Sequence, residues 1–537
     1  MCLTKISDHS LVWNSIIFIF RKMIELHFSL FNYFWGVLFM NFNIIRSLSF
    51  ATLFTAIGVL LTPSISVAKS NIVIGLQQEP TSLDPTSDAT ASIDGMLSHN
   101  VYESLTTVSE AGEVLPALAE SWTISEDKLT YVFNLASGVK YHDGSAFDSA
   151  DVIFAFNRAM AEDSVNPTKK IFKVIESVSA PNANTIEIKL KKQNAFFLFN
   201  MAKGDASIVA EETAASNNTN PVGTGPFKFS SWKRGDRLVL VKNQDHREAS
   251  GVALERVEFR FISDAAAASA AMLSEEIDAF PGFPAPEMLP QFQADPRFRV
   301  NIGSTEGEVI LAMNNAKAPF NDIRVRRAIS HAIDRNEIID GAMYGKAVPI
   351  GSFYPPHGAA YVDLTQAYPH DTDKAKKMFE DAGVAGMEMT LRLPPFPYAM
   401  RSGEIIQAQL AEAGINAKVE QVEWGFWISE VYKKKAYDMT IIAHTSPNDM
   451  GNFARGPKYF YGYDDPKFSD LWSRIKTEAD PEKRKMMLEE GQRYLTDQAV
   501  HGFLFQLPLL GIFKNEVKGY WSSAPVLFHP LKGVSVN

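Results

Sequence analysis

The pattern of apolar and polar residues predicts strands and helices in alternation near the middle of the chain. The apolar run at residues 309–313 is too short for a helix and predicts a strand that is buried on both faces. Asn321 is placed to cap a helix, and Asp334 followed by Glu337 predicts that a second helix begins directly after it. The expected buried face of the first helix recurs at helical spacing and consists of Val325, Ala328, Ile329, Ala332 and Ile333.

Further along, the pattern predicts three strands joined by two helices. Strands are expected at residues 387–393, 415–424 and 437–443, and helices at residues 404–413 and 426–434. The handedness rule for such β-α-β-α-β units predicts a parallel sheet. In parallel sheets of this kind, ligands bind beyond the carboxyl ends of the strands.

Three loops therefore converge at one edge of the predicted sheet, at residues 394–398, 424–427 and 444–449. They are rich in aromatic residues and carry a few polar groups, which is typical of a small-molecule cleft. Trp424 is the first candidate because a rigid ring offers stacking area at a small entropic cost, although it could instead pack between sheet and helix. His444 could donate to an anionic ligand or bond a neighbouring carbonyl. The candidate ligand-binding residues from these loops are Tyr398, Trp424, His444, Asn448 and Asp449.

Composition limits the classes of function. A chain of 537 residues is too long for one core, and its 46% hydrophobic and 21% charged residues are ordinary for globular domains. The net charge of −10 argues against nucleic acid as a partner. The single cysteine, Cys2, excludes an internal disulfide and a cysteine-ligated metal site. No cofactor and no metal are expected.

Two short motifs are interpreted as backbone turns. His142 and Asp143 precede a glycine and could be metal ligands, but adjacent polar residues in a glycine turn favour a turn. Gly223 and Gly225 could suggest a phosphate-binding loop. No lysine–serine pair follows them, and Pro226 blocks the helix that would supply the amides.

The first 68 residues have the pattern of a targeting segment. An apolar run at residues 48–61 is preceded by Arg46 and followed by small residues that end at Ala68, which predicts export and cleavage after Ala68. Met40 stands where such a signal would begin, so residues 1–39 are interpreted as the product of an upstream start codon. The alternative is a genuine extra segment, whose apolar runs are shorter than the ~20 residues that a spanning helix needs.

Several separated stretches resemble the family-5 extracellular solute-binding proteins, the receptors of bacterial ABC importers for peptides, opines, nickel and sugars. The resemblance implies an α/β fold with two lobes, the Venus-flytrap form, with an extra small subdomain in the first lobe. The implied domains are residues 1–68, a first lobe of 69–308 plus 500–537 with a subdomain at about 100–208, and a second lobe of 309–499. The motifs that carry the resemblance are Glu79-Pro80-Thr81-Ser82-Leu83-Asp84-Pro85, Asn100-Val101-Tyr102-Glu103-Ser104-Leu105, the stretch 115–158, Pro319-Phe320, Val325-Arg326-Arg327-Ala328 and Ala332-Ile333-Asp334.

The resemblance also implies a function. The mature protein is expected to be a periplasmic monomer that binds a small polar, peptide-like solute and delivers it to an inner-membrane permease, without catalysis. Tyr102 is a further candidate that could line the cleft or pack in the core. Dipeptide-binding members hold the ligand with an aspartate and an arginine, but Pro447 and Leu393 stand at those positions, which puts a plain dipeptide in doubt. A secreted hydrolase and a haem- or opine-binding protein remain the alternatives.

Overall fold

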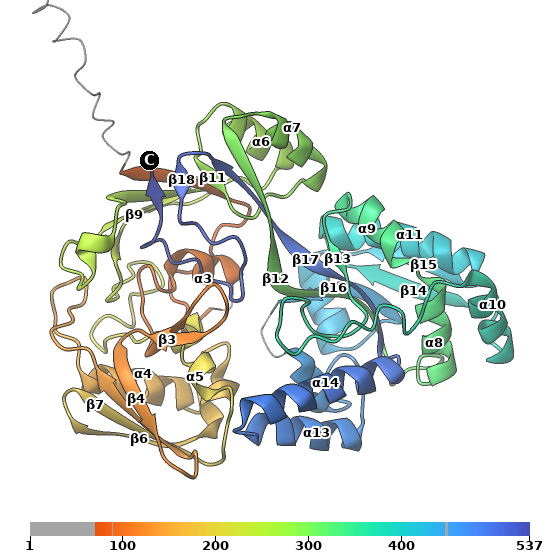
Figure 1. Ribbon diagram of the computed structural model, residues 1–537, viewed down its shortest axis with the longest axis horizontal. Coiled ribbons are helices and arrows are strands. Elements are labelled where there is room, and N and C mark those ends of the chain that lie inside the picture. The colour runs from red at the N-terminus through yellow and green to blue at the C-terminus, as the bar shows by residue number, and fades with distance from the viewer. Residues whose placement is uncertain (1–69, 89, 446–448) are drawn as a thin grey trace, which may run out of the picture. The chain divides into compact units, whose positions relative to one another are not determined.

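The computed structural model describes residues 70–88, 90–445 and 449–537, all within the compact unit Ala68–Asn537 (Figure 1). The expected signal segment, the cleavage site after Ala68 and Asn448 lie outside these residues. The helices are α3 (Ala91–Leu97), α4 (Ser149–Met160), α5 (Phe197–Asn200), α6 (Ala265–Leu273), α7 (Leu289–Ala294), α8 (Ile323–Ala332), α9 (Arg335–Met343), α10 (Thr372–Asp381), α11 (Pro397–Glu412), α12 (Trp424–Phe426), α13 (Pro466–Thr477) and α14 (Pro481–Asp497).

One eleven-stranded sheet runs through the described part of the chain, in the order β15-β14-β16-β12-β17-β11-β1-β10-β9-β8, with β13 paired to β17. Its strands are β1 (Asn71–Leu76), β8 (Phe227–Lys233), β9 (Arg237–Lys242), β10 (Arg256–Phe261), β11 (Ala279–Phe280), β12 (Phe298–Met313), β13 (Val348–Pro349), β14 (Glu388–Leu393), β15 (Asn416–Gln421), β16 (Met439–His444) and β17 (His501–Lys514). A separate four-stranded sheet consists of β4 (Ala119–Ile124), β5 (Thr130–Leu135), β7 (Thr185–Leu190) and β6 (Ile175–Asn182). Two short hairpin pairs are formed by β2 (Thr106–Val108) with β3 (Val114–Pro116) and by β18 (Val517–Lys518) with β19 (Ser535–Val536).

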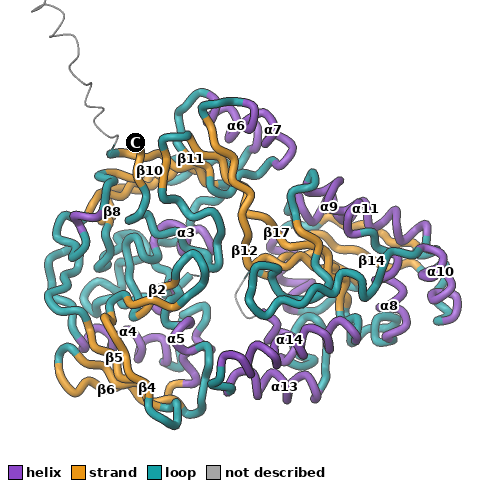
Figure 2. The backbone as a smooth tube through the Cα atoms, viewed as in Figure 1, coloured by secondary structure: helices purple, strands orange, loops and turns teal. Residues whose placement is uncertain are grey.

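Two long antiparallel strands, β12 and β17, connect the two lobes (Figures 1 and 2). The start of β12 pairs with the end of β17, where β17 also pairs with β11 of the first lobe. The end of β12 pairs with the start of β17 and with β16 of the second lobe. The register between β12 and β17 shifts between Ser304 and Glu308. Both strands therefore belong to both lobes, and their irregular centre lies between the two cores.

The alternation of side chains along β12 builds the two cores of the second lobe. Val309, Leu311 and Met313 pack on one face with residues of α8, α9, α10 and α11. Ile310 and Ala312 pack on the opposite face with an aromatic-rich core from residues 350–503. The expected strand that is buried on both faces is confirmed, because residues 309–313 are all fully buried.

The helix that follows β12 begins one residue later than the sequence predicted. Asp322, and not Asn321, is the cap of α8, since its side chain accepts a hydrogen bond from the Arg324 amide at 2.8 Å. The aspartate competes successfully because its ionised oxygen also bonds the Arg324 guanidinium. The predicted buried face of this helix and the cap at Asp334 are both confirmed.

The predicted parallel sheet is confirmed in the second lobe. Strand β14 pairs in parallel with both β15 and β16. Helix α11 begins at Pro397, earlier than expected, because a proline suits the first turn of a helix. The second predicted helix is divided into α12 and a seven-residue π-helix, Trp427–Lys433.

In the first lobe, the turn with Gly223 and Gly225 is hydrogen-bonded to the segment at Val101 and to the turn with His142. The amide of Gly225 donates to Val101 O at 2.9 Å, and a Cβ at Gly225 would lie only 2.4 Å from Asn100 O. His142 Nε2 lies 3.0 Å from Gly225 O, and burial lowers the pKa of this imidazole to about 4, so it is neutral at pH 7. Asp143 caps its own turn through Ser145. Both motifs are therefore structural, as the sequence indicated.

Candidate functional site

The three predicted loops meet beyond the carboxyl ends of β14, β15 and β16. The ring of Phe396, after β14, contacts Trp424, after β15, with a centroid separation of 5.2 Å. The hydroxyl oxygen of Tyr398 accepts a hydrogen bond from the Ala443 amide in β16 at 3.0 Å. The expected convergence is therefore confirmed for the first two loops, and Tyr398 contacts the end of β16 just before the third.

Trp427 is a buried ring that supports Trp424, and Trp424 is partly exposed at the site. Trp427 is buried, and its indole N–H donates to Thr440 Oγ1 at 2.9 Å. Trp424 stacks on Trp427 with centroids 5.0 Å apart and planes 7° apart, yet 42% of Trp424 stays exposed. A ring that is supported on one face and partly exposed suits ligand stacking. This role for Trp424 stays a prediction.

His444, the last residue of β16, is held by its neighbours. Its Nε2 lies 2.7 Å from the Tyr461 hydroxyl, and its Nδ1 lies 3.6 Å from Asp449 Oδ2. Its ring also contacts Phe353 and Phe460. The partner of His444 in the structure is thus a hydroxyl group, and not the carbonyl considered from the sequence.

Tyr102 is placed differently from the other candidates. Its side chain is fully buried in the core of the first lobe, and its hydroxyl donates to Leu83 O at 3.1 Å. The interpretation of Tyr102 as a cleft-lining residue is therefore corrected: it is a core tyrosine whose polar end is satisfied internally. Tyr398 and Asp449 are partly buried at the site, and Asp449 also accepts from Asn452.

Neither nearby arginine is free for a ligand carboxylate in this structure. Leu393, which stands where dipeptide-binding members have an arginine, is fully buried in the core. Arg392 is paired with Glu420 at 3.0 Å, and Arg401 is paired with Glu287 of the first lobe at 3.0 Å. The sequence-based doubt about a plain dipeptide is consistent with this geometry.

Sequence reasoning missed an acidic group beside these loops. Glu308 in β12 lies directly opposite His444 in the antiparallel register and opposite Gln506 of β17. It is only 4% exposed, and its Oε2 has no hydrogen-bond partner among the described residues. The signal in the sequence was a single acid directly before the apolar run at residues 309–313.

The surroundings of Glu308 are acidic and aromatic. Burial raises its pKa well above the usual value, and the carboxylates of Asp449 and Glu306 raise it further. Burial also raises the pKa of Tyr354 to about 12, with help from Glu306 and Glu308. Burial therefore favours the protonated form of Glu308 in the structure as it stands.

Residues 113–463 match the family model described as bacterial extracellular solute-binding proteins, family 5 (middle). The chain belongs to this family. The resemblance that the sequence motifs indicated is thereby confirmed.

Three relatives illustrate the range of family-5 proteins that this chain resembles. The dipeptide-binding protein of Escherichia coli (strain K12) is 28% identical over 472 residues, which cover 79% of this chain and 86% of the relative. Heme-binding protein A of Haemophilus influenzae is 27% identical over 493 residues, which cover 82% and 87%. A periplasmic binding protein of Helicobacter pylori, DppA, solved in complex with peptide STSA, has a TM-score of 0.75 and 26% identity, and the match covers 87% of this chain and 98% of that one.

The two-lobed α/β fold expected for a family-5 protein is confirmed by these structural matches.

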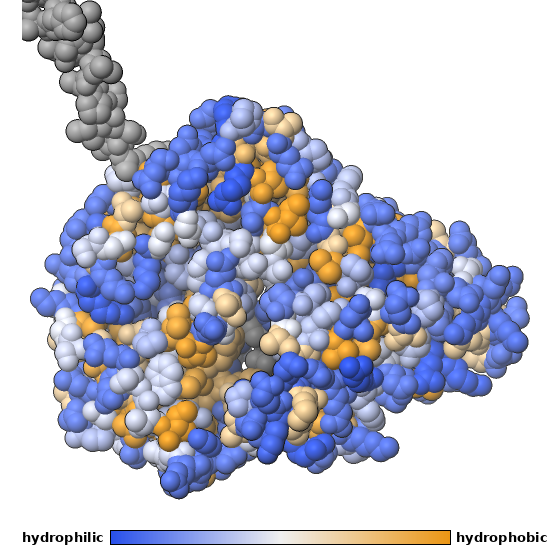
Figure 3. Space-filling model, in the orientation of Figure 1, coloured by the Kyte–Doolittle hydropathy of each residue, from blue (hydrophilic) through white to orange (hydrophobic). Residues whose placement is uncertain are grey.

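Two contacts join the lobes near the site in addition to the Arg401–Glu287 pair. Phe196 stacks on Trp472 with centroids 6.0 Å apart, and the Ala195 amide donates to Lys476 O at 2.8 Å. The space-filling view shows a hollow in this face of the molecule, with hydrophobic side chains along part of its rim (Figure 3). The domain bounds inferred from the sequence stay a prediction, since β12 and β17 cross both lobes.

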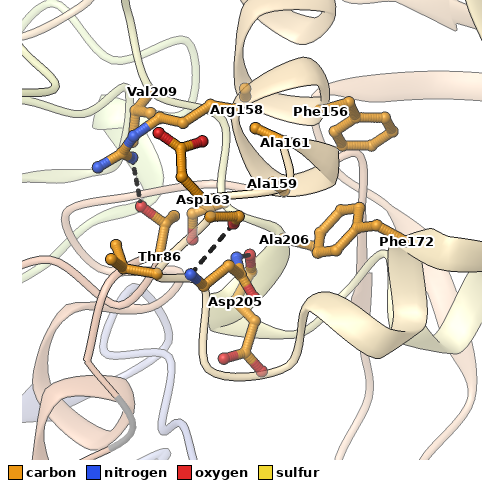
Figure 4. A pocket seen from close by; sticks show the side chains of 15 residues that line it. Thr86, Phe156, Arg158, Ala159, Ala161, Asp163, Phe172, Asp205, Ala206 and Val209 are labelled. Carbon is orange, nitrogen blue, oxygen red and sulfur yellow. Dashed lines mark hydrogen bonds between the residues drawn. The ribbon is translucent and has the colours of Figure 1, made fainter.

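A separate cavity of about 220 Å³ lies within the first lobe (Figure 4). Its wall includes Arg158, whose guanidinium donates to Thr86 Oγ1 at 2.8 Å and pairs with Asp84 at 3.3 Å. None of the candidate residues from the sequence lines it. The candidate site therefore lies at the loops of the second lobe, where the aromatic and polar candidate residues are found, and not at this cavity.

Neither a metal-binding cluster nor a membrane-spanning helix is found within residues 70–88, 90–445 and 449–537. No group of three His, Cys, Asp or Glu side chains in these ranges is arranged to hold a metal ion. In the same ranges, no helix has both the length and the apolar character needed to cross a lipid bilayer.

Proposed function

We propose that this family-5 protein is the periplasmic receptor of an ABC importer and binds a peptide or peptide-like solute between its lobes. The observation that carries the proposal is the set of aromatic and polar loops at the carboxyl ends of β14, β15 and β16, next to the strands that connect the lobes. Contacts that exist only when the lobes meet around a solute favour the closed arrangement, which is a population shift.

The names of the relatives support a peptide as the solute. The relative from Escherichia coli is a dipeptide-binding protein, and the structure from Helicobacter pylori holds a four-residue peptide. In this chain Leu393 is buried and Arg392 and Arg401 are paired, so the ligand carboxylate has no arginine at the expected place. We infer that the solute differs from a plain dipeptide at its carboxyl end.

The proposal is tested with purified protein and a library of di- and tripeptides. A true ligand at a hundredfold excess over its dissociation constant stabilises the protein by about 2.7 kcal/mol, which a thermal shift measures. Native mass spectrometry of the protein as purified should identify a solute that is retained from the cell. A protein that responds to no member of the library contradicts a peptide as the solute.

Two alternative functions are tested by further measurements on the same purified protein. Steady hydrolysis of a bound peptide would favour a secreted hydrolase. A Soret shift on addition of haem would favour haem as the solute, which the relative from Haemophilus influenzae brings into consideration. Export, cleavage after Ala68, a monomeric state and an inner-membrane permease as partner belong to the proposal, and N-terminal sequencing of the purified protein tests the cleavage.

A further inference from the structure

The carboxyl group of Glu308 has an unusual position for an acid. The side chain is 4% exposed, and no ion pair joins it to a described lysine, arginine or histidine. Burying an acid without a partner is costly, and such groups concentrate at functional sites. Glu308 lies in β12 at the end of the stretch, between Ser304 and Glu308, where the register with β17 is broken.

The two acids near Glu308 already have side-chain partners, in contrast to the Oε2 atom of Glu308. Glu306 Oε1 lies 2.8 Å from His357 Nε2, and Gln506 Nε2 lies 2.9 Å from His357 Nδ1. The Gln506 amide is a donor, so the ring proton of His357 lies on Nε2 and is donated to Glu306. Asp449 lies 3.6 Å from His444 Nδ1 and accepts from Asn452.

The surroundings of Glu308 also suit a cation. Its neighbour across the strands, His444, is enclosed by the rings of Phe353, Phe460 and Tyr461. Aromatic faces attract a cation through their quadrupole, and the carboxylates of Glu306 and Asp449 add negative charge. The site thus combines a buried acid whose Oε2 has no partner among the described residues, two further acids, and aromatic rings around the opposing histidine.

We propose that Glu308 binds a protonated amine or guanidinium group of the solute, which becomes the missing partner of this carboxylate. The inference rests on the proposed function, because it specifies the chemical class of the solute that the same site binds. Burial favours the protonated acid before binding. A cation that binds there ionises Glu308, and the proton passes to the solvent.

The proton release gives a test that needs only the wild-type protein. The best binder from the peptide library is titrated by calorimetry in two buffers with different ionisation enthalpies. The titration is repeated at several pH values between about 5 and 7. We expect release of up to about one proton per solute bound wherever Glu308 is protonated before binding, since its raised pKa must fall on binding. Binding that releases no proton at any pH in this range overturns the subsite.

Matched analogues show which cation binds. Each binder is compared with its N-acetyl form and, where it contains arginine, with its citrulline form. Neutralising the bound cation should weaken binding to the wild type by roughly tenfold or more, as for other charge-assisted hydrogen bonds. Sensitivity to acetylation identifies the N-terminal ammonium, and sensitivity to citrulline identifies a side chain.

The variant Glu308→Gln keeps the shape of the side chain and removes the charge. It should bind the cationic solute roughly tenfold more weakly, discriminate between the matched analogues by less than about threefold, and release no proton. Glu404→Gln, an exposed acid on α11, is the control with the same change in charge. Unchanged affinity and discrimination in Glu308→Gln overturn the subsite and leave the receptor function standing. A library with no binder for either protein overturns both.

Discussion

Glu308 and His444 lie directly opposite one another in strands β12 and β16, but they differ in how their polar side-chain atoms are satisfied. His444 Nε2 lies 2.7 Å from the Tyr461 hydroxyl, while Glu308 Oε2 has no partner among the described residues. The pair lies at the end of the strand pairing, beside the broken register that separates the two lobes. A charge change at Glu308 is therefore placed to affect both solute binding and the stability of the protein.

The first prediction concerns the stability of the protein without ligand. The pKa of Glu308 is raised above the usual 4.5, so the folded state binds its proton more tightly than the unfolded state does. The stabilising effect of this tighter binding is fully present below about pH 4.5 and is lost as the pH rises through the raised pKa. Glu308→Gln should be more stable near pH 7 by about 1–3 kcal/mol, and unfold at a higher temperature, because burial disfavours the ionised acid that the unfolded wild type prefers, whereas Gln does not ionise.

The measurement is thermal unfolding of both proteins between pH 4 and pH 8. The difference between them should grow with pH, because only the wild type carries the acid. Glu404→Gln should follow the wild-type curve. A difference that shrinks as the pH rises would show that Glu308 has a counter-ion in the folded protein.

The second prediction separates the two stacked tryptophans. Trp424→Ala should weaken solute binding by roughly tenfold and lower the free energy of unfolding by about 1–2 kcal/mol, since the ring contacts Phe396 and Trp427 while 42% of the residue stays exposed. Trp427→Ala should destabilise the fold by about 3–5 kcal/mol, because that ring is buried and hydrogen-bonded to Thr440. Calorimetric binding and denaturant unfolding measure the two effects.

The control for Trp424 is Met486→Ala on α14, which removes an exposed apolar side chain of the second lobe away from the three loops. It should leave both binding and stability unchanged. If Trp424→Ala binds the solute as tightly as the control does, the ring does not face the ligand.

The sequence predicted those parts of the fold that depend on local pattern. The apolar run at residues 309–313 predicted the buried centre of β12, and the alternation of strands and helices predicted the parallel pairing of β14 with β15 and β16. The same pairing rule predicted which loops meet. Periodicity and handedness are sufficient for such features because they act within a short stretch of chain.

The features that depend on distant partners could not be predicted. Tyr102 is a core residue because Leu83 O accepts its hydroxyl proton, which no local pattern indicates. Glu308 is a buried acid without an ion pair only because β16 and β17 place His444 and Gln506 beside it, and neither strand places a lysine or arginine there. The choice of Asp322 over Asn321 as a helix cap depends on the geometry of one turn.

The third prediction tests the glycine turn of the first lobe. In Gly225→Ala the new Cβ would lie 2.4 Å from Asn100 O, and this neighbour is backbone that cannot rotate away. We expect a loss of about 1–3 kcal/mol in the free energy of unfolding, as for other overpacked positions. Gly251→Ala is the control, since a Cβ there meets no atom within 4 Å, and it should change stability by less than about 0.5 kcal/mol. Equal denaturation midpoints for the two variants would contradict the close approach.

The fourth prediction concerns the contact between the lobes. Phe196, next to α5, stacks on Trp472 of α13 with centroids 6.0 Å apart, and this contact exists only while the lobes meet. Phe196→Ala should shift the ligand-free protein toward the open arrangement, because an aromatic pair of this kind contributes about 0.5–1.5 kcal/mol. Small-angle scattering should then give a larger radius of gyration without ligand and the wild-type value with saturating ligand.

The same shift should weaken solute binding by roughly two- to tenfold, since the solute must supply the free energy that the lost contact contributed. Phe199→Ala on α5, three residues from Phe196, is the matched control, because Phe199 packs against the cluster of Val526 and Phe528 within the first lobe. It should lower the unfolding temperature without changing the radius of gyration. An unchanged radius of gyration in Phe196→Ala, with unchanged affinity, would show that the stacked pair does not hold the lobes together. The Arg401–Glu287 pair would then be tested in the same way by Arg401→Ala.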